Sequence, residues 1–432
     1  MRGGFSFLFI LLMACSLYGQ DCERPGSIPG VIFTRRTALL HMMDSTSALV
    51  IKAEDAVYDA DIEPYRQSPD FFNLTGIDEP GYKMIVTPVG YKSGSGIKHI
   101  LIFTYPDQMS ETIPLSSSDT LLDEKLFLPV LAEISGHIKT LYYYPLPKLS
   151  NDWLNGKTVI SERETKKVFE LAHPGVKLKS ASKLFTAIRL IKTPQETELI
   201  KKAIAMTGDG IVSAMKHCKP GMHEYELQAI IEYEAKRQGA QSMAFASIIG
   251  SGTNSLSPHY EKNTCVMNKG DLVVMDVGAR YGEFCADITR TIPVSGQFTP
   301  DQEIIYQAVL DIQKAVIDMI RPGITLSDLD RKTTQLTRKA GYVNYILHSV
   351  THTVGLEVHD VATGDTLRPG MIITVEPGIY IPVNDTVQPL KRRGFGVRIE
   401  DDVLVTADGH ELLSQAIPKE IADIGKLMRR KK

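Results

Sequence analysis

The sequence predicts a two-domain protein, in which an N-terminal α/β domain precedes an α+β domain that contains an internal repeat. Three observations support this fold class. The chain has 432 residues, which is more than one hydrophobic core usually holds. Short apolar runs alternate with helical stretches from about residue 31 to residue 184, and the remainder contains two segments that match at an offset of one hundred residues. The composition, with 43% hydrophobic and 23% charged residues, is that of a globular protein rather than of a disordered chain.

The first residues have the character of a signal peptide. Arg2 precedes the apolar run Phe5–Ala14, which is too short to cross a bilayer core of about 30 Å. We expect residues 1–19 to be removed, so that the mature protein is secreted or periplasmic. The alternative is a lipoprotein signal that would lipidate Cys15. No other apolar run is long enough for a transmembrane segment, so none is expected in the mature chain.

The N-terminal domain is predicted to contain a sheet with covering helices. Apolar runs of about five residues, rich in valine and isoleucine, are typical of buried strands. Such runs occur at Ser47–Ile51, Tyr82–Val86 and His99–Phe103. We therefore expect an α/β domain over residues 22–188.

A capping motif marks the start of the second domain, which we expect to span residues 190–432. Thr193 can cap a helix, Pro194 suits its first position, and Glu196 can complete a capping box. The helix that begins there should present Ile200, Ala203, Ile204 and Ile211 on one face.

The second domain repeats its order of elements. A break at Lys219–Gly221 and a second helix through Leu227, Ile230 and Ile231 follow the first helix. The second half has a helix opened by Thr299, then a break at Arg321–Gly323 and another helix near Ser327. The first helix of this half should bury one face, with the apolar residues Ile304, Ile305, Ala308 and Ile312.

A strand follows the helices in each half. The segments Gly270–Gly278 and Gly370–Gly378 each carry an acid six residues after the first glycine, namely Asp276 and Glu376. This duplication predicts two equivalent units related by a pseudo-twofold axis, with their strands pooled in one curved sheet and the helices on one side. Equivalent acids would then meet near the axis.

Four acids of these strands are candidates for a metal site. Asp276 and Asp287 belong to the first half, and Glu376 and Glu400 belong to the second. The apolar runs around them predict burial, and an ionised carboxylate is costly to bury without a positive partner. Divalent metal ions would supply that partner.

Three histidines lie just before the Glu376 strand, at positions 348, 352 and 359. Four carboxylates and one imidazole suit two divalent ions such as Mn²⁺ or Co²⁺ better than one tetrahedral Zn²⁺. Two ions about 3.5–4 Å apart can hold a hydroxide between them and polarise a carbonyl group. This arrangement predicts a hydrolase.

Asp276, Asp287, His352, Glu376 and Glu400, in this order, resemble the five metal ligands of the pita-bread metallopeptidases. Similarity to the aminopeptidase P and prolidase branch of that family extends over about residues 30–415. The segments that carry it are His259–Tyr260, Gly355–Asp360, Glu376–Tyr380, Val397–Asp401 and, in the first domain, Tyr65–Gly76.

The resemblance implies a creatinase-like N-terminal domain and a pita-bread catalytic domain. It implies that Asp276 binds one metal ion, that His352 binds the other, and that Asp287 and Glu400 bridge them. Glu376 would be both a ligand and the catalytic base. The remaining site residues would be His259, His348 and His359, which position the substrate carbonyl and stabilise the tetrahedral intermediate, and Arg398, which orients Glu400 or its neighbours.

The function that follows is a metal-dependent aminopeptidase that cleaves the Xaa-Pro bond at the N-terminus of peptides through a hydroxide between two divalent ions. Mn²⁺ is the expected metal, with Co²⁺ or Zn²⁺ as alternatives. The expected partners are peptides with proline at the second position and a second copy of the chain in a homodimer. A prolidase that cleaves only dipeptides, and a pita-bread protein that binds without catalysis, are the competing hypotheses. The net charge of −3 gives no reason to expect nucleic acid as a partner.

Overall fold

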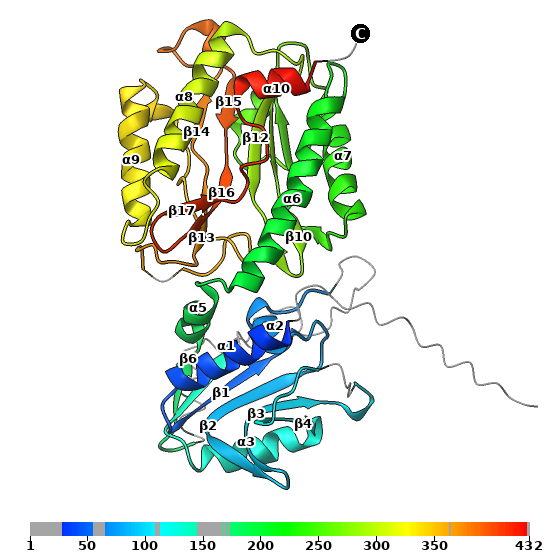
Figure 1. The fold of residues 1–432 in the computed structure, drawn as a ribbon, viewed down its shortest axis with the longest axis vertical. Coiled ribbons are helices and arrows are strands. Elements are labelled where there is room, and N and C mark those ends of the chain that lie inside the picture. The colour runs from blue at the N-terminus through cyan, green and yellow to red at the C-terminus, as the bar shows by residue number, and fades with distance from the viewer. Residues whose placement is uncertain are drawn as a thin grey trace, which may run out of the picture.

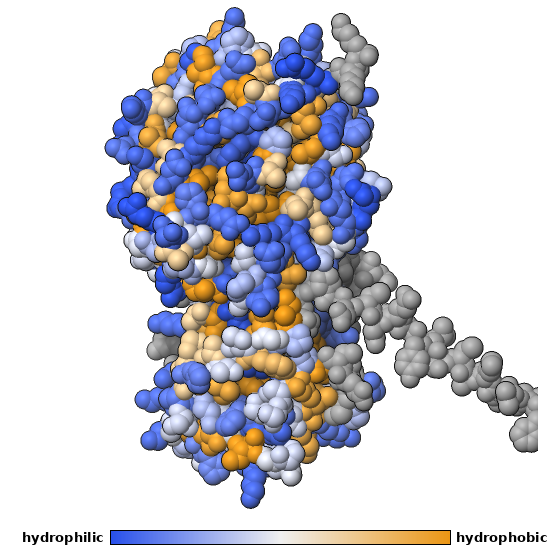
Figure 2. Space-filling view, viewed as in Figure 1, coloured by the Kyte–Doolittle hydropathy of each residue, from blue (hydrophilic) through white to orange (hydrophobic). Residues whose placement is uncertain are grey.

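The computed structural model of the chain contains two lobes joined by a narrow waist (Figures 1 and 2). It describes residues 28–54, 65–108, 113–144, 167, 171, 173–362 and 364–429. The predicted signal peptide, its cleavage site and Cys15 lie outside these residues. Hydrophilic side chains cover much of the C-terminal lobe in this view, with apolar residues interspersed (Figure 2).

A six-stranded mixed sheet forms the centre of the N-terminal domain, with the strand order β4-β3-β2-β1-β5-β6. Strands β1, β2 and β3 pair antiparallel, whereas the pairs β1–β5, β3–β4 and β5–β6 are parallel. The elements of this domain are α1 (Pro29–Met42), β1 (Ser47–Lys52), α2 (Pro69–Thr75), β2 (Lys83–Ser93), β3 (Gly96–Thr104), β4 (Asp119–Asp123), α3 (Phe127–Ser135), β5 (Thr140–Tyr144), β6 (Lys177–Ser180) and α5 (Ser182–Arg189).

Helices cover both faces of this sheet, which confirms the α/β class. Leu49 and Ile51 of β1 pack in one cluster with residues of α1, α2 and α5, such as Phe185. Their neighbours Ala48 and Val50 point to the other face and pack in a second cluster with residues of α3, such as Phe127. The alternation follows from the two-residue period of a strand, so both faces of β1 must be apolar.

The two lobes meet at a short connection between α5 and α6 (Pro194–His217). Thr193 caps α6 as predicted, because its hydroxyl accepts a hydrogen bond from the Glu196 amide and the Glu196 carboxylate accepts one from the Thr193 amide. Ile188 packs in the core of the N-terminal domain, and Leu190 packs in a core of the C-terminal domain.

The repeated helices of the C-terminal domain are present in both halves. They are α6 and α7 (Glu224–Arg237) in the first half, and α8 (Pro300–Ile317) and α9 (Leu326–Lys339) in the second. In the view of Figure 1 these two pairs lie on opposite sides of the domain, with the strands between them. The predicted apolar face of α8 was wrong at Ile304, which is 44% exposed, because the buried face runs through its neighbour Ile305.

The strands of this domain form four short sheets, so the prediction of one continuous curved sheet was wrong. The sheets have the orders β11-β10-β7, β12-β9-β8, β13-β16-β17 and β14-β15. The elements are β7 (Ser242–Met243), β8 (Ile248–Ser251), β9 (Leu272–Val277), β10 (Ala279–Tyr281), β11 (Phe284–Cys285), β12 (Ile288–Pro293), β13 (Ile372–Val375), β14 (Gly378–Ile381), β15 (Phe395–Arg398), β16 (Asp401–Val405), β17 (His410–Leu412) and the terminal helix α10 (Ile421–Leu427).

Side chains replace part of the backbone pairing where the two halves meet, which explains the break in the sheet. The Thr291 hydroxyl donates to the carbonyl oxygen of Arg398 at 2.8 Å and accepts from its amide at 3.1 Å. One backbone hydrogen bond, from the Glu400 amide to the Thr289 carbonyl oxygen at 3.1 Å, crosses nearby. The halves are therefore joined next to the predicted acids.

Gly278, directly after β9, allows two backbone segments to approach each other. A Cβ atom at this position would lie 1.8 Å from the carbonyl oxygen of Ala286. Only glycine fits there, and the approach brings the strand of Asp276 beside the segment of Asp287.

Among the helices that the structure describes, none combines the length and apolar character needed to cross a bilayer.

The capping box of α8 provides a test of the helix boundaries. Thr299→Ala removes the hydroxyl that accepts from the Gln302 amide, and should lower the free energy of unfolding by about 1 kcal/mol. As a control, Thr334→Ala lies inside α9, where the hydroxyl donates to the Asp330 carbonyl oxygen, and should change it by less than about 0.5 kcal/mol. Urea unfolding of both variants measures the difference, and equal losses would contradict the assignment.

Candidate metal centre

A cavity of about 570 Å³ lies between the two halves of the C-terminal domain. All nine predicted site residues line it: Asp276, Asp287, His352, Glu376 and Glu400, together with His259, His348, His359 and Arg398. Phe245, Ile248 and Val358 contribute an apolar part of the wall. The structure thus brings together residues that are far apart in the sequence.

In the first half, two antiparallel strands deliver the acids. Asp276 is paired with Thr289 across β9 and β12, and Asp287 immediately precedes β12. Both residues are buried, with 8% and 5% of their surface exposed. The extended backbone directs alternate side chains to one face, which places Asp287 and Thr289 on the same side of the strand.

The second half also positions its acids at the ends of two antiparallel strands. Glu376 follows the last residue of β13, Glu400 precedes the first residue of β16, and these strands pair so that Val375 lies opposite Asp401. The segment that carries the histidines runs along β13. It is held there by hydrogen bonds from the Thr374 amide to the His352 carbonyl oxygen and from the Glu376 amide to the Val350 carbonyl oxygen, both 2.9 Å.

His352 lies at the centre of the acids. Its Nε2 atom is 3.4 Å from Oδ2 of Asp287 and 3.3 Å from Oε1 of Glu376. Potential ligand atoms of Asp287, His352 and Glu400 lie within 4.8 Å of one another. These distances leave room for a cation that all three residues could contact.

Arg398 orients the acids of both halves. Its Nη2 atom donates to Oδ2 of Asp276 at 2.6 Å, and its Nε atom donates at 3.2 Å to the hydroxyl of Thr289. That hydroxyl donates in turn to Oε2 of Glu400 at 2.6 Å. Arg398 therefore contacts Asp276 directly and reaches Glu400, its expected partner, through Thr289.

The other histidines lie around this centre. His348 contacts Glu376, with 3.6 Å between Nδ1 and Oε2, and its Nε2 atom is 2.7 Å from the hydroxyl of Tyr380. The ring of His359 lies edge-on to that of His352, with 4.3 Å between their centroids. His259 follows Pro258, whose carbonyl oxygen accepts a hydrogen bond from Arg398.

Burial and crowding perturb the titration of the acids. Burial raises the pKa of Asp287 to about 7, and the nearby Asp276 adds to this effect. Burial, with Asp287, Glu376 and Asp276 close by, also holds the pKa of Glu400 well above its usual range. Burial alone would lower the pKa of His352, but contacts with Asp287 and Glu376 raise it to about 11. The centre thus has an excess of negative groups.

This donor set fits divalent metal ions. Oδ1 of Asp276 is buried and has no hydrogen-bond partner in the structure, although a buried carboxylate oxygen normally has one. Carboxylates of both halves surround it, and oxygen-rich sets of this kind suit hard or borderline divalent cations. Asp276, Asp287, His352, Glu376 and Glu400 are therefore the residues that would hold them.

Sequence reasoning assigned no role to three residues that support the centre. Thr289 links Arg398 to Glu400, and Tyr380 contacts both His348 and Arg398. The carboxylate of Asp402 accepts a hydrogen bond from the Asp287 amide at 3.1 Å. Each is two or four residues from a predicted ligand in the sequence, and Tyr380 also ends the segment Glu376–Tyr380 that carries the family resemblance.

Comparisons with known proteins identify the family of the chain. Residues 198–407 match the family described as metallopeptidase family M24, and residues 32–112 match the N-terminal domain of aminopeptidase P. The chain is 31% identical to the Xaa-Pro aminopeptidase of Escherichia coli K12, over 91% of this chain and 96% of the relative. It is 32% identical to human Xaa-Pro aminopeptidase 3, over 87% of this chain and 80% of the relative.

A solved structure of E. coli aminopeptidase P with the inhibitor Pro-Leu has a similar fold, with a TM-score of 0.78 and 28% identity, and the match covers 93% of this chain and 98% of that one. The two domains and the donor set define a metallopeptidase. The chain belongs to the Xaa-Pro aminopeptidase, or aminopeptidase P, group of metallopeptidase family M24.

The pKa shifts predict how the stability of the metal-free protein depends on pH. The folded protein keeps a proton on Asp287 up to about pH 7 and on His352 up to about pH 11, whereas the unfolded chain releases them near pH 4 and pH 6.5. This stabilisation is complete below the unfolded pKa values and is lost as the pH rises through the folded ones. The melting temperature of the metal-free protein should therefore fall from pH 5 to pH 9.

A saturating divalent metal should reverse this trend, because metal ions bind deprotonated ligands more tightly as the pH rises. Differential scanning fluorimetry after dialysis against a chelator, with and without added metal, measures both curves. A metal-free melting temperature that rises from pH 5 to pH 9 would contradict the proposed electrostatics.

Proposed function

We propose that the chain is an aminopeptidase that uses two divalent metal ions to hydrolyse the bond between the first residue of a peptide and a proline at the second position. The observation that carries this proposal is the cluster of four carboxylates and His352 in one cavity, with three more histidines around it. The match to Xaa-Pro aminopeptidases over most of the chain supports the choice of substrate.

In this proposal Asp276, Asp287, His352, Glu376 and Glu400 hold the ions, and Mn²⁺ is the expected metal because the set is mainly carboxylate oxygen. Co²⁺ and Zn²⁺ are the alternatives. When bound, the ions would lower the pKa of a water molecule and polarise the carbonyl group of the substrate. The rest of the mechanism depends on side chains of this protein.

Glu376 is proposed as the base that takes the proton of the attacking water. Burial alone would raise its pKa, but the contact with His352 and the charge of Arg398 lower it. The carboxylate therefore stays ionised and can accept a proton, which it can then deliver to the nitrogen of the leaving proline.

Neutral histidines are proposed to hold the substrate carbonyl. Burial lowers the pKa values of His348 and His359, so both rings are neutral near pH 7. A neutral imidazole carries one N–H group, which can donate to an oxygen that becomes negative in the transition state. His259 lines the same cavity and is assigned the same role.

A prolidase, which cleaves only dipeptides, is the second candidate function. The Xaa-Pro dipeptidase of Pyrococcus furiosus is 40% identical to this chain, but the match covers only 53% of the chain. The aminopeptidase reading is favoured because the N-terminal region also matches the aminopeptidase P domain. A pita-bread protein without catalysis is disfavoured because all five metal-ligand positions carry suitable donors.

A direct assay separates these functions. With added Mn²⁺, the protein should release the first residue from a tripeptide Xaa-Pro-Xaa faster than it cleaves the dipeptide Xaa-Pro, and a chelator should abolish both activities. Mass spectrometry of the products measures them. Cleavage of the dipeptide alone would mean a prolidase, and activity that survives complete metal removal would reject the metal mechanism.

Asp276→Asn is the matched variant for this assay, because it keeps the size of the side chain and removes a charge beside the ions. It should lower activity by at least about 100-fold, which corresponds to about 2.7 kcal/mol in the activation barrier. Asp423→Asn makes the same chemical change on the exposed surface of α10 and should leave activity unchanged.

Export and pairing complete the proposal. The apolar leader favours removal of residues 1–19. The N-terminal sequence of the protein isolated from its native cell should therefore begin at Gln20. An intact Met1 in the cytoplasm would contradict export.

The chain is also proposed to form a homodimer. Analytical ultracentrifugation at micromolar concentration should then give twice the mass of one chain, and the mass of a monomer would contradict the dimer.

A further inference from the structure

A buried arginine lies where the two domains meet. Arg189 is the last residue of α5, and its side chain is only 3% exposed. Its Nη1 atom is 2.8 Å from Oδ1 of Asp70 in the N-terminal domain, and its Nη2 atom is 2.7 Å from Oε2 of Glu357 and also pairs with Oδ1 of Asp360 in the C-terminal domain. Lys192 pairs with the other oxygen of Asp360 at 3.0 Å.

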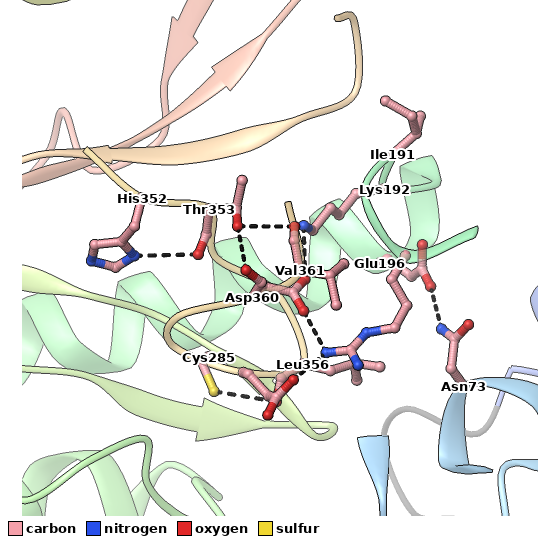
Figure 3. Close-up of polar contacts among 12 residues, drawn as sticks. Asn73, Ile191, Lys192, Glu196, Cys285, His352, Thr353, Leu356, Asp360 and Val361 are labelled. Carbon is pink, nitrogen blue, oxygen red and sulfur yellow. Dashed lines mark hydrogen bonds and ion pairs between the residues drawn. The ribbon is translucent and has the colours of Figure 1, made fainter. Parts of the chain in front are cut away.

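Asp360 closes the segment that carries two of the site histidines, residues 352–360, which we call the histidine loop. The Thr353 hydroxyl donates to the Asp360 carbonyl oxygen at 2.6 Å, and the Asp360 amide donates to the Thr353 carbonyl oxygen at 2.9 Å. Figure 3 shows Thr353 between His352 and Asp360, and Lys192 to the right of Thr353 in that view. His359 is the residue just before Asp360.

The same contacts set the orientation of the His352 ring. Its Nδ1 atom lies 3.2 Å from the carbonyl oxygen of Thr353. A proton on Nδ1 that is donated to this oxygen leaves Nε2, which faces Asp287 and Glu376, free to bind a cation. The position of the Thr353 backbone therefore decides which nitrogen of His352 can serve as a ligand.

The histidine loop packs tightly against the ion pairs. A Cβ atom at Gly355 would lie 2.0 Å from Oδ2 of Asp360 and 2.9 Å from Cε of Lys192. The loop has no spare volume at this point, so a shift of Asp360 must shift the loop.

The N-terminal domain has no direct part in the cavity as far as the structure describes it, because the lining residues all lie between positions 245 and 400. An effect of that domain on the site must therefore pass through contacts between the domains. The buried Asp70–Arg189–Asp360 pairs are such a contact, and they end at the histidine loop.

We infer that Arg189 is a positioning residue, which ties Asp70 of the N-terminal domain to Asp360 and thereby holds the histidine loop in the geometry that presents His352 and His359. This inference deepens the proposed function and rests on it for the role of the histidines. Arg189 suits the task because its planar guanidinium carries five N–H donors in a fixed geometry, so that Asp70 and Asp360 can be held at the same time.

A second ion pair between the domains supplies a matched control. Arg35 of α1 pairs with Glu196 of α6 and also donates to the Ile191 carbonyl oxygen at 3.1 Å. It is also buried, with 6% of its surface exposed against 4% for Arg189, and it also joins the domains, but within the described residues its hydrogen bonds do not reach the histidine loop. Loss of Arg35 therefore weakens the contact between the domains at the start of α6 and leaves the contacts of the histidine loop in place.

The experiment compares Arg189→Met, Arg189→Lys and Arg35→Met in the full chain. Hydrogen exchange is measured on the metal-free protein, and Mn²⁺ affinity is measured by titration calorimetry. Arg189→Met should increase exchange within the histidine loop, residues 352–360, and weaken Mn²⁺ binding by about 10- to 100-fold, as is usual when a group that orients a metal ligand is removed. Arg189→Lys should restore part of the loss, and Arg35→Met should leave both measurements at the wild-type level.

Unchanged exchange and Mn²⁺ affinity in Arg189→Met would overturn the inference, and so would an equal change in Arg35→Met. If Arg189→Met does not fold, Asp70→Asn replaces it, because this variant removes the carboxylate of the N-terminal domain and keeps Arg189 beside Asp360. Asp70→Asn should then change both measurements in the same direction, and wild-type values would overturn the inference. The exchange measurement needs neither metal nor substrate, so it separates this inference from a failure of the proposed peptidase activity.

Discussion

The structure depends on four carboxylates that are buried around one cavity. Asp276, Asp287, Glu376 and Glu400 repel one another there, and burial makes each charge more costly. His352 and Arg398 provide some positive charge, yet one oxygen of Asp276 still has no partner. The cavity therefore lacks positive charge, which the divalent cations of a metallopeptidase would supply.

Because the domain is duplicated, a single chain can bring four acids to one cavity. Each half supplies two of the four acids, from the ends of an antiparallel strand pair. The halves then join through Thr289, Thr291 and Arg398, whose side chains take over from regular strand pairing. The irregular junction breaks the sheet, and it also leaves the strand ends free to turn their acids toward a common point.

The N-terminal domain contacts the segment of the site histidines through ion pairs, and it contributes no residue to the cavity wall within the described part of the chain. Its six-stranded sheet packs on its own cores, and the contact with the site runs through buried ion pairs at the junction. Buried ion pairs add little net stability but are strongly directional, because a displaced partner leaves an uncompensated charge. This property suits them to fixing the orientation of one domain against a loop of the other.

Local patterns in the sequence determined the helices, the capping boxes at Thr193 and Thr299 and most strands, because these features depend on residues that are near in the chain. The internal repeat related Asp276 to Glu376, because the two segments match residue by residue. The duplicated strands and the histidine cluster pointed to the four acids and to His348, His352 and His359. The resemblance to a known family added His259, Arg398 and the individual roles. The structure gathers all nine residues in one cavity, while their roles stay predictions. The division of the sheet, the link from Arg398 through Thr289 to Glu400, and the pairing of Arg189 with Asp70 and Asp360 were decided only by tertiary structure. They join residues more than one hundred positions apart, whose meeting depends on how whole domains pack and leaves no local periodicity to read.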